Sequence, residues 1–270
     1  MLCIPLGAAL FREGVMDGEQ IKELVRSRYA GVAEGAAGCC GPAKAPEEAS
    51  SRMGYSAAEL ASAPAGANLG LGCGNPRAVA AMQLGEVIVD LGSGAGFDCF
   101  LAAQKVGATG RVIGVDMTHE MLKKARDNAA RTGIANVAFR LGEIEHLPVA
   151  DNTADVVISN CVINLVPDKA QVYCEAFRVL KPGGRIAISD VVNIAPLPPE
   201  LANDEALLCG CIAGAARSAE VEHWLAAAGF VDIRINVKAE SRELVKTWAP
   251  GRAIENYVAS ATIEARKPVS

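Results

Sequence analysis

A glycine-rich turn between an apolar segment and a helical segment is the feature that most constrains the fold of this chain. The sequence VIVDLGSGAGF, residues 87–97, has Gly92, Gly94 and Gly96 directly after a short apolar run. Glycines at such a point let the backbone turn tightly and approach a nucleotide-like ligand closely. Asp116 ends the next apolar run, where a carboxylate can accept hydrogen bonds from both hydroxyls of a ribose. The pattern predicts a strand, a binding loop, a helix and a second strand.

Apolar runs and helical segments continue to alternate along the chain. The runs predict strands over residues 86–91, 111–116, 137–142, 154–159 and 184–192. The segments between them predict helices over residues 97–106, 118–133 and 169–180. This order predicts an α/β fold with a doubly wound, mostly parallel sheet covered on both faces. Beyond it we expect a helix over 218–228, a strand over 230–238, a helix near 241–247, and an edge strand over 255–267.

The chain is expected to have one main domain behind an N-terminal cap. Residues 1–75 contain one amphipathic segment, 17–32, and loops rich in glycine and cysteine, so we assign them to the cap. Residues 76–270 are assigned to the ligand-binding domain, which has an insertion near 196–217 after the fifth strand. Neither an internal repeat nor a proline-rich linker divides the predicted sheet.

Charge and hydrophobicity exclude several classes of function. The net charge is −5, from 26 Lys and Arg against 31 Asp and Glu, and the basic residues form no block. A nucleic-acid partner is therefore not expected. The sequence lacks a run of 18 apolar residues and a recognisable secretion signal, so we expect a cytoplasmic protein without a membrane span. Small molecules are the expected ligands.

The spacing of the glycine loop separates two candidate cofactors. It has the pattern G-x-G-x-G, whereas dinucleotide-binding loops have G-x-G-x-x-G. Asp90 also ends the first strand, where a carboxylate would repel a pyrophosphate but accept hydrogen bonds from an ammonium group. S-adenosylmethionine has an ammonium group and no phosphate, so the loop favours it over NAD.

The cysteines point to a thiophilic ligand. Their number, nine, is odd, and without a secretion signal a disulfide scaffold is a poor explanation. Without a C-x-x-C pair, and with three histidines, a structural zinc site has weak support. Cys161 follows the fourth strand, at the edge where open α/β sheets bind ligands. Thiolates that converge there would form a soft-ligand cage.

Parts of the chain resemble the class I S-adenosylmethionine-dependent methyltransferases, from about Glu86 to Lys267. The glycine loop, LGEIEHLP (141–148) and LKPGGR (180–185) carry this resemblance. It implies a Rossmann-like sheet of seven strands whose last strand is antiparallel. It also implies that Ile144 and Glu145 flank the adenine of the cofactor.

A more specific resemblance covers nearly the whole chain from about Tyr29. NLGLGCGNP, VIGVDMTHEML, SNCVINLVPDK and CIAGA closely resemble segments of arsenite methyltransferases. The resemblance implies that trivalent arsenic is the substrate, bound by Cys161 and Cys211 with help from Cys73 and one cysteine of the early pair, for which we choose Cys39. Whether Cys40 or Cys209 also takes part stays open. The implied cofactor-binding residues are Asp90, Gly92, Ser93, Gly94, Gly96, Asp116, Met117, Ile144, Glu145 and Asn160.

The implied reaction involves further partners and leaves alternatives. Arsenite or an arsenic–thiol conjugate would be the substrate, and a small thiol or a thioredoxin-type protein the reductant. We expect a monomer. One alternative is a methyltransferase that acts on another small organic acceptor, with packed cysteines. Another is a protein that binds arsenic or a metal and keeps the cofactor fold without turnover.

Overall fold

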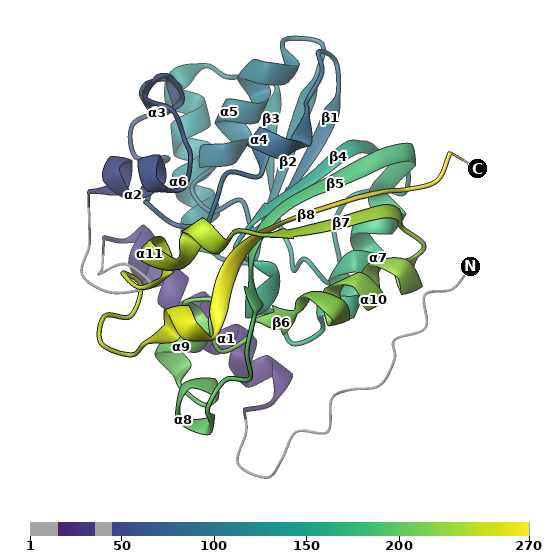
Figure 1. The fold of residues 1–270 in the computed structure, drawn as a ribbon. Coiled ribbons are helices and arrows are strands. Elements are labelled where there is room, and N and C mark those ends of the chain that lie inside the picture. Colours follow the sequence, from purple (N-terminus) through teal and green to yellow (C-terminus); the bar gives the residue numbers. More distant parts are fainter. Residues whose placement is uncertain (1–15, 36–44, 270) are drawn as a thin grey trace.

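The computed structural model describes residues 16–35 and 45–269. Their main feature is one sheet with the strand order β3-β2-β1-β4-β5-β8-β7, and a two-residue strand, β6, pairs with β5 beside this path (Figure 1). The strands are β1 (Val87–Leu91), β2 (Arg111–Asp116), β3 (Val137–Leu141), β4 (Ala154–Asn160), β5 (Leu180–Asn193), β6 (Ala216–Arg217), β7 (Val231–Val237) and β8 (Val258–Arg266). Strands β1 to β5 are parallel to one another. The predicted fold class, a doubly wound and mostly parallel sheet, is confirmed.

Helices cover both faces of the sheet. Successive residues of a strand point to opposite faces, and in these strands the residues on each face are apolar. Ile88 of β1 belongs to one buried cluster, with Cys99 and Val106 of α5. The next residue, Val89, belongs to the cluster on the opposite face, which contains residues of α7 and α10 (Figure 1). Such continuous apolar runs are typical of parallel strands that are buried on both faces. This packing fixes the carboxyl ends of the strands at one edge, where the site forms.

The helices of the sheet domain follow the predicted alternation closely. They are α4 (Arg77–Ala80), α5 (Phe97–Val106), α6 (His119–Thr132), α7 (Lys169–Val179), α8 (Pro199–Ala202), α9 (Glu205–Cys209), α10 (Ser218–Ala228) and α11 (Arg242–Val245). Three single turns of 3-10 helix are η1 (Ile163–Leu165), η2 (Ala239–Ser241) and η3 (Ile254–Asn256). Gly133 and Gly229 end α6 and α10 in the left-handed conformation that glycine adopts without steric cost.

The C-terminal strands correct one prediction. The segment 255–267 was expected at the edge of the sheet, but β8 lies between β5 and β7 and pairs antiparallel with both. Eight of its nine residues are buried or half-buried, which an interior strand requires. Strand β7 forms the edge instead, and five of its seven residues are exposed, among them Val231 and Val237. An alternating pattern does not distinguish these two positions, because pairing partners lie far away in the sequence.

The N-terminal helices lie over the carboxyl ends of the strands. They are α1 (Gly18–Ala33), α2 (Pro46–Arg52) and α3 (Ala57–Ser62). Asp17 caps α1 and exchanges hydrogen bonds with Gln20, which explains where this helix begins. Helix α1 lies beside α6 and α9, so the cap contacts both the cofactor side and the insertion side of the edge (Figure 1).

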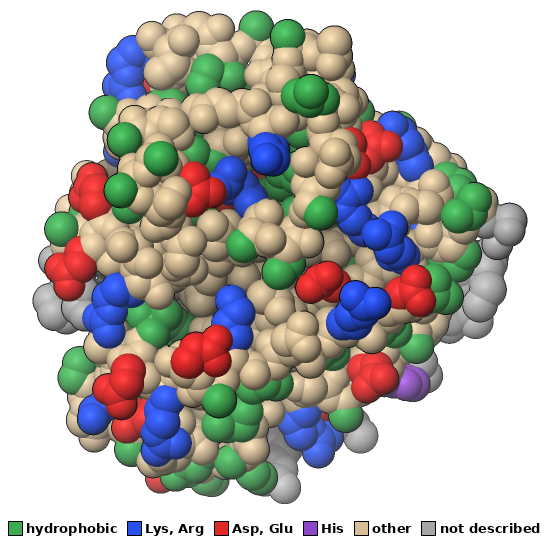
Figure 2. Space-filling model, turned by 45° about the horizontal axis from the view of Figure 1, so that its top comes forward, with side chains coloured by type: hydrophobic (Ala, Val, Ile, Leu, Met, Phe, Trp, Pro, Cys, Tyr) green, Lys and Arg blue, Asp and Glu red, His purple; other side chains and the backbone are tan. Residues whose placement is uncertain are grey.

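In the part of the chain that the structure describes, none of the helices combines the length and apolar character needed to cross a membrane. On the face shown in Figure 2, acidic and basic side chains are interspersed. The charge of this face is therefore mixed.

Candidate active site

A cavity lies at the carboxyl ends of the parallel strands, where the sequence predicted a binding site. Nine of the ten predicted cofactor-binding residues line it: Asp90, Gly92, Ser93, Gly94, Asp116, Met117, Ile144, Glu145 and Asn160. Cys161 lines it too. We call this space the donor cavity. The segments that form it come from β1, β2, β4 and the loop after β3, which are neighbours only in the folded sheet.

Gly96 is the predicted residue that does not line the donor cavity. It precedes α5 with a φ of 90°, and a Cβ there would lie 2.8 Å from atoms of Phe100 and Phe139. A Cβ atom does not approach other carbon atoms that closely in proteins. Gly96 therefore allows α5 to pack closely on the sheet, and its role in binding is indirect.

Asp116 shapes the glycine loop from the end of β2. Its carboxylate accepts hydrogen bonds of 2.8 Å from the backbone N–H of Gly94 and of Thr118. Burial raises the pKa of Asp116, while these two N–H groups act to lower it. The carboxylate is thus held in one orientation at the wall of the cavity, where it has further lone pairs for the hydroxyls of a ligand.

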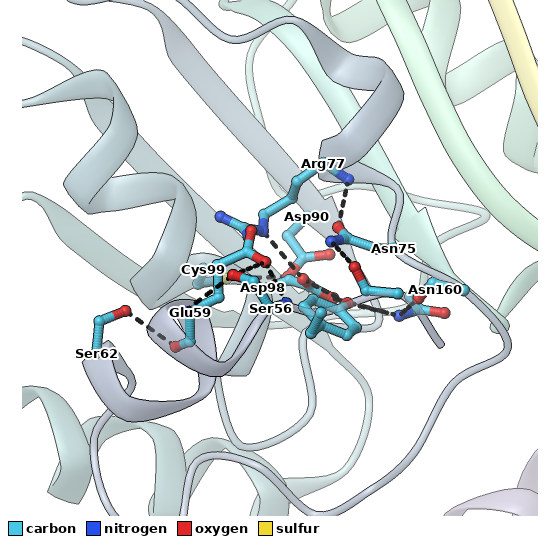
Figure 3. Close-up of polar contacts among 12 residues, drawn as sticks. Ser56, Glu59, Ser62, Asn75, Arg77, Asp90, Asp98, Cys99 and Asn160 are labelled. Carbon is cyan, nitrogen blue, oxygen red and sulfur yellow. Dashed lines mark hydrogen bonds and ion pairs between the residues drawn. The ribbon is translucent and has the colours of Figure 1, made fainter. Parts of the chain in front are cut away.

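Two buried carboxyl groups meet below the glycine loop. Asp90 accepts a hydrogen bond from the thiol of Cys99 at 3.1 Å, and Asp98 lies 3.5 Å from Nε of Arg77 (Figure 3). Burial, followed by the charge of Asp98, raises the pKa of Asp90 well above its usual range. Burial also raises the pKa of Asp98, although Arg77 opposes this effect. A cationic group in the cavity would stabilise both carboxylates.

The cavity fits S-adenosylmethionine on the observations of this structure. Two buried polar atoms of the residues that line the donor cavity, Oγ of Ser93 and Nδ2 of Asn68, lack a hydrogen-bond partner among the described residues. Such atoms are normally satisfied by a ligand or by water. The carboxylates of Asp90 and Asp98 would face its ammonium group, and they disfavour a ligand that carries a pyrophosphate. When bound, this molecule supplies an electrophilic methyl group on a sulfonium.

A hydrogen-bond network joins the donor cavity to the N-terminal cap, and sequence reasoning missed most of it. The hydroxyl of Tyr55 lies 2.8 Å and 2.9 Å from the two carboxylate oxygens of Asp98. The side-chain amide of Asn160 donates to Gly74 O at 2.8 Å and to the Tyr55 hydroxyl at 3.1 Å (Figure 3). Asn160 Oδ1 accepts from the backbone N–H of Cys73 at 3.1 Å. Asn160 therefore contacts both the cavity and the loop that carries Cys73.

Three of the four predicted arsenic-binding cysteines come together beside the cavity. Sγ of Cys73, Sγ of Cys161 and one carboxylate oxygen of Asp190 lie within 4.8 Å of one another. The thiol of Cys211 donates a 2.7 Å hydrogen bond to the carbonyl oxygen of Cys161. We call Cys73, Cys161 and Cys211 the thiol cluster. The fourth predicted residue, Cys39, lies outside the described residues, as does Cys40.

Two members of the thiol cluster have an unusual backbone conformation. Cys161 has a φ of 59° and Cys211 a φ of 63°, which is the left-handed region. Non-glycine residues there cost about 1 to 3 kcal/mol each and persist where surrounding contacts fix them. The N–H of Cys161 is held by the carbonyl of Ser189, and that of Cys211 by the carbonyl of Leu208. Strain of this kind is concentrated at functional sites.

Two thiols of the cluster, those of Cys73 and Cys161, have a raised pKa. Burial raises the pKa of Cys73, against a hydrogen bond with Cys161 that lowers it. For Cys161, the hydrogen bond with Cys211 lowers the pKa, but the hydrogen bond with Cys73 and burial outweigh it and raise the pKa well above its usual value. A raised pKa favours the protonated thiol, so a ligand that binds these two sulfurs displaces their protons.

Helix α1 closes one side of the site. Its residues Val25 and Tyr29 line the donor cavity, and the Tyr29 hydroxyl donates to the carbonyl oxygen of Cys209 at 3.1 Å. Lys22 lies 2.6 Å from Glu143 and 3.4 Å from Glu145 in the loop after β3. The sequence identified α1 as an amphipathic helix, but which residues it faces depends on contacts across more than 100 residues of chain.

The comparisons with known proteins agree with this geometry. Residues 82–229 match the family model described as "Methyltransferase domain". The chain is 52% identical to the arsenite methyltransferase of Halobacterium salinarum over 265 residues, which cover 93% of this chain and 68% of that protein. The chain belongs to the arsenite methyltransferase family. The predicted family is thus confirmed, and the matched methyltransferase domain lies within the segment that we assigned to ligand binding.

Two further members of the arsenite methyltransferase family show how far the similarity reaches. The human arsenite methyltransferase is 46% identical over 137 residues, which cover 47% of this chain and 36% of the human protein. A solved structure of an arsenic (III) S-adenosylmethionine methyltransferase from Chlamydomonas reinhardtii is 34% identical, with a TM-score of 0.60, and covers 84% of this chain and 74% of that one. The chain thus spans about two thirds of the Halobacterium salinarum protein and about one third of the human one.

Proposed function

We propose that this protein transfers a methyl group from S-adenosylmethionine to trivalent arsenic bound by the thiol cluster. One observation carries the proposal: Cys161 belongs to the thiol cluster and also lines the donor cavity. An arsenic atom on this sulfur would stand next to the methyl donor. Proximity of two bound reactants is what a transfer without further chemical groups requires.

Protonated thiols suit the capture of arsenite. Arsenite is the neutral molecule As(OH)3, and each thiol that binds it exchanges one As–O bond for one As–S bond. The thiol proton leaves with the displaced hydroxyl as water, so the exchange produces no net charge. An arsenic–thiol conjugate reacts in the same way, and the proton then leaves on the departing thiol. The raised pKa values of Cys73 and Cys161 are thus compatible with binding.

The transfer itself needs position and a dry site. Arsenic with three sulfur ligands keeps a lone pair, which attacks the methyl carbon while the carbon–sulfonium bond breaks. The lone pair requires no deprotonation, so a general base is unnecessary. Cys73 and Cys211 are 2% and 3% exposed, and burial of this degree excludes most water from the arsenic.

A reductant completes the proposed cycle. Methylation takes arsenic from the trivalent to the pentavalent state, so two electrons are needed before the next transfer. A pair of thiols can supply them by forming a disulfide, and we propose a small thiol or a thioredoxin-type protein as the donor. Cys39 remains the proposed additional thiol on the enzyme. A monomeric state and the division of the chain near residue 75 remain predictions.

The proposal is tested with arsenite, S-adenosylmethionine and glutathione, and methylated arsenicals are quantified over time. We expect product from the unmodified protein and background levels from Cys161→Ser. Calorimetric titration should show that Cys161→Ser binds S-adenosylmethionine with nearly unchanged affinity, which establishes that the variant is folded. Absence of product from the folded, unmodified protein would refute the proposal. Arsenic binding without turnover would then favour a binding protein.

The cofactor role of Asp116 is tested separately. Asp116→Ala removes the carboxylate that would accept the ribose hydroxyls and that orients Gly94. Loss of hydrogen bonds to a charged group costs about 1.5 to 3 kcal/mol, so affinity for S-adenosylmethionine should fall by at least about tenfold. Arsenite binding to the thiols should survive. Unchanged calorimetric affinity for the donor would contradict the assignment of Asp116.

A further inference from the structure

Asp190 is a buried carboxyl group beside the thiol cluster that the proposed methyl transfer does not use. It lies near the end of β5 and is 3% exposed. Its Oδ1 accepts hydrogen bonds from Asn164 Nδ2 at 2.9 Å and from the N–H of Val191 at 2.8 Å. Its Oδ2 is buried without a hydrogen-bond partner among the described residues. An unsatisfied buried carboxylate oxygen costs free energy unless a ligand or water reaches it.

The position of Asp190 gives the thiol cluster an oxygen donor. One of its carboxylate oxygens lies within 4.8 Å of the sulfur atoms of Cys73 and Cys161, and these two sulfurs also lie within 4.8 Å of each other. Three atoms so arranged can contact one ion after small side-chain movements. The thiol of Cys211 donates a hydrogen bond to the carbonyl oxygen of Cys161, so a side-chain rotation can bring a further sulfur toward this group.

This donor set suits a divalent cation better than it suits trivalent arsenic. Arsenic bound to three thiolates carries its lone pair in the fourth direction, so it has no position for a carboxylate. Zinc has no lone pair there and takes four ligands in a tetrahedron, commonly cysteine sulfur together with carboxylate oxygen. The cation would also hold the thiols as thiolates, because metal binding deprotonates a coordinating thiol. Lys169 and Lys238 interact electrostatically with Asp190 and Cys73 and would offset part of the excess negative charge.

We propose that Cys73, Cys161 and Asp190, with Cys211 as fourth ligand, form a binding site for a thiophilic divalent cation of the zinc and cadmium class. The ion occupies sulfurs that the proposed function assigns to arsenic, so it competes with arsenite. In this respect the inference rests on the proposed function. Asp190 is the residue that distinguishes the two ligands, because it contacts the divalent cation and lies outside the sulfur cage of arsenic.

The test measures zinc and arsenite binding to the full-length, fully reduced chain. Zinc affinity is obtained by competition with a chromophoric chelator, and arsenite binding by direct titration. We expect one zinc ion per chain. Asp190→Asn should weaken zinc binding by at least about tenfold, since even outer-shell partners of metal ligands account for roughly that much. Arsenite affinity should fall by a much smaller factor.

A matched control keeps the result interpretable. Asp155→Asn makes the same chemical change at the opposite end of the sheet, where Asp155 binds Lys181 and the N–H of Val87. At that separation zinc affinity should stay within about twofold of the unmodified protein. Asp190→Asn keeps the Oδ1 acceptor for Asn164 and Val191, and a thermal unfolding scan verifies its fold. Cys73→Ser is a second variant that should weaken zinc binding without changing Asp190.

Each outcome decides the inference. Equal zinc affinities of Asp190→Asn and the unmodified protein would overturn it, as would zinc binding below one ion per chain. Arsenite binding without zinc binding would refute the inference and leave the proposed function intact. Zinc binding without arsenite binding would refute the proposed function and leave the zinc site intact. In turnover, zinc should raise the apparent KM for arsenite at unchanged kcat; a lower kcat at unchanged KM would place the ion elsewhere and contradict the proposal.

Discussion

At the scale of single residues, the left-handed conformation of Cys161 and Cys211 links stability to function. A side chain in this region brings Cβ close to the backbone, and glycine alone avoids the cost. The protein nevertheless has cysteine at both positions. Their sulfur atoms reach the place where we propose that arsenic binds, from a backbone geometry that the fold must stabilise elsewhere.

This strain predicts an inverted order of stability for two substitutions. Cys161→Gly should be more stable than Cys161→Ala by about 1 kcal/mol, because glycine tolerates a positive φ and alanine does not. At Cys99, inside α5, the order should be the normal one, with the alanine variant more stable by about 1 kcal/mol. Urea unfolding of the four variants measures both differences. If the alanine variant were more stable than the glycine variant at both positions, the backbone at Cys161 would not be strained.

Asp90 gives a prediction about pH. Its pKa in the folded protein is raised well above its usual value, chiefly by burial. The folded state therefore holds this proton more tightly than the unfolded state, and the stabilisation that comes with protonation is lost as pH rises through the folded pKa. Asp90→Asn removes this penalty, so the variant should gain stability over the unmodified apo protein at high pH. The gain should shrink as pH falls through the folded pKa, as denaturant titrations across pH would show.

At the scale of elements, α1 and the segment 45–80 hold the site closed from one side. Val25 and Tyr29 of helix α1 line the donor cavity. Lys22 of the same helix contacts the loop after β3. Burial acts to lower the pKa of Lys22, but its hydrogen bond to Glu143 and the nearby negative charges outweigh this and raise it. The charged pair thus helps to keep α1 over the cavity.

Removal of this charge should weaken donor binding. Lys22→Met leaves the apolar stem of the side chain but breaks the contacts with Glu143 and Glu145, so α1 should open more often. A partly exposed ion pair contributes up to about 1 kcal/mol, which corresponds to an affinity loss of about threefold to fivefold for S-adenosylmethionine. Lys123→Met on α6, which breaks an exposed pair with Asp127, is the matched control. Equal calorimetric affinities of both variants would argue against closure by α1.

The segment 45–80 is held against α5 by the contact between Tyr55 and Asp98. Tyr55→Phe removes the hydroxyl that donates to Asp98 and leaves this buried carboxylate with fewer partners, at a cost of about 1 to 3 kcal/mol in the free energy of unfolding. Because the same network holds the Cys73 loop, arsenite affinity should fall as well. A double-mutant cycle with Asp98→Asn isolates the pair. A coupling energy near zero would mean that the contact does not hold the segment in place.

At the scale of the whole molecule, the site joins three distant parts of the chain. Cys73 lies between α3 and α4, Cys161 follows β4, and Cys211 follows α9. An arsenic atom bound to all three closes long loops across the sheet. Ligands that bind the folded state alone stabilise it in proportion to the logarithm of their concentration.

Arsenite should therefore raise the unfolding temperature measurably. At a free concentration 100 times Kd the gain is about 2.7 kcal/mol, and a domain of this size shifts by about 2 to 4 °C per kcal/mol. We expect a rise of roughly 5 to 10 °C in calorimetric scans with a non-thiol reductant present. Cys161→Ser should show a much smaller rise. A shift that is equal in both proteins would indicate binding at other cysteines.

The fold was predictable from the sequence to a greater extent than the site. Strands β1 to β5 were recognisable because local signals agree, namely apolar runs, glycines and capping residues. The place of β8 in the sheet was predicted wrongly, at the edge, because its pairing with β5 and β7 depends on residues far away in the sequence. The clustering of Cys73, Cys161 and Cys211 followed from the resemblance, whereas the contact between Tyr55 and Asp98 had no local signal. Asp190 lies in ISDVV, where nothing marks an acid as buried beside a thiol.

The interior position of β8 determines when the site can exist during synthesis. The end of β5 carries Asp190, and β5 lacks its antiparallel neighbour until residues 258–266 have left the ribosome. Cys73, Cys161 and Cys211 are all translated before that point, on a chain whose sheet is still open. A chain still in synthesis therefore presents these thiols separately, and the thiol cluster is complete only once β8 has paired with β5.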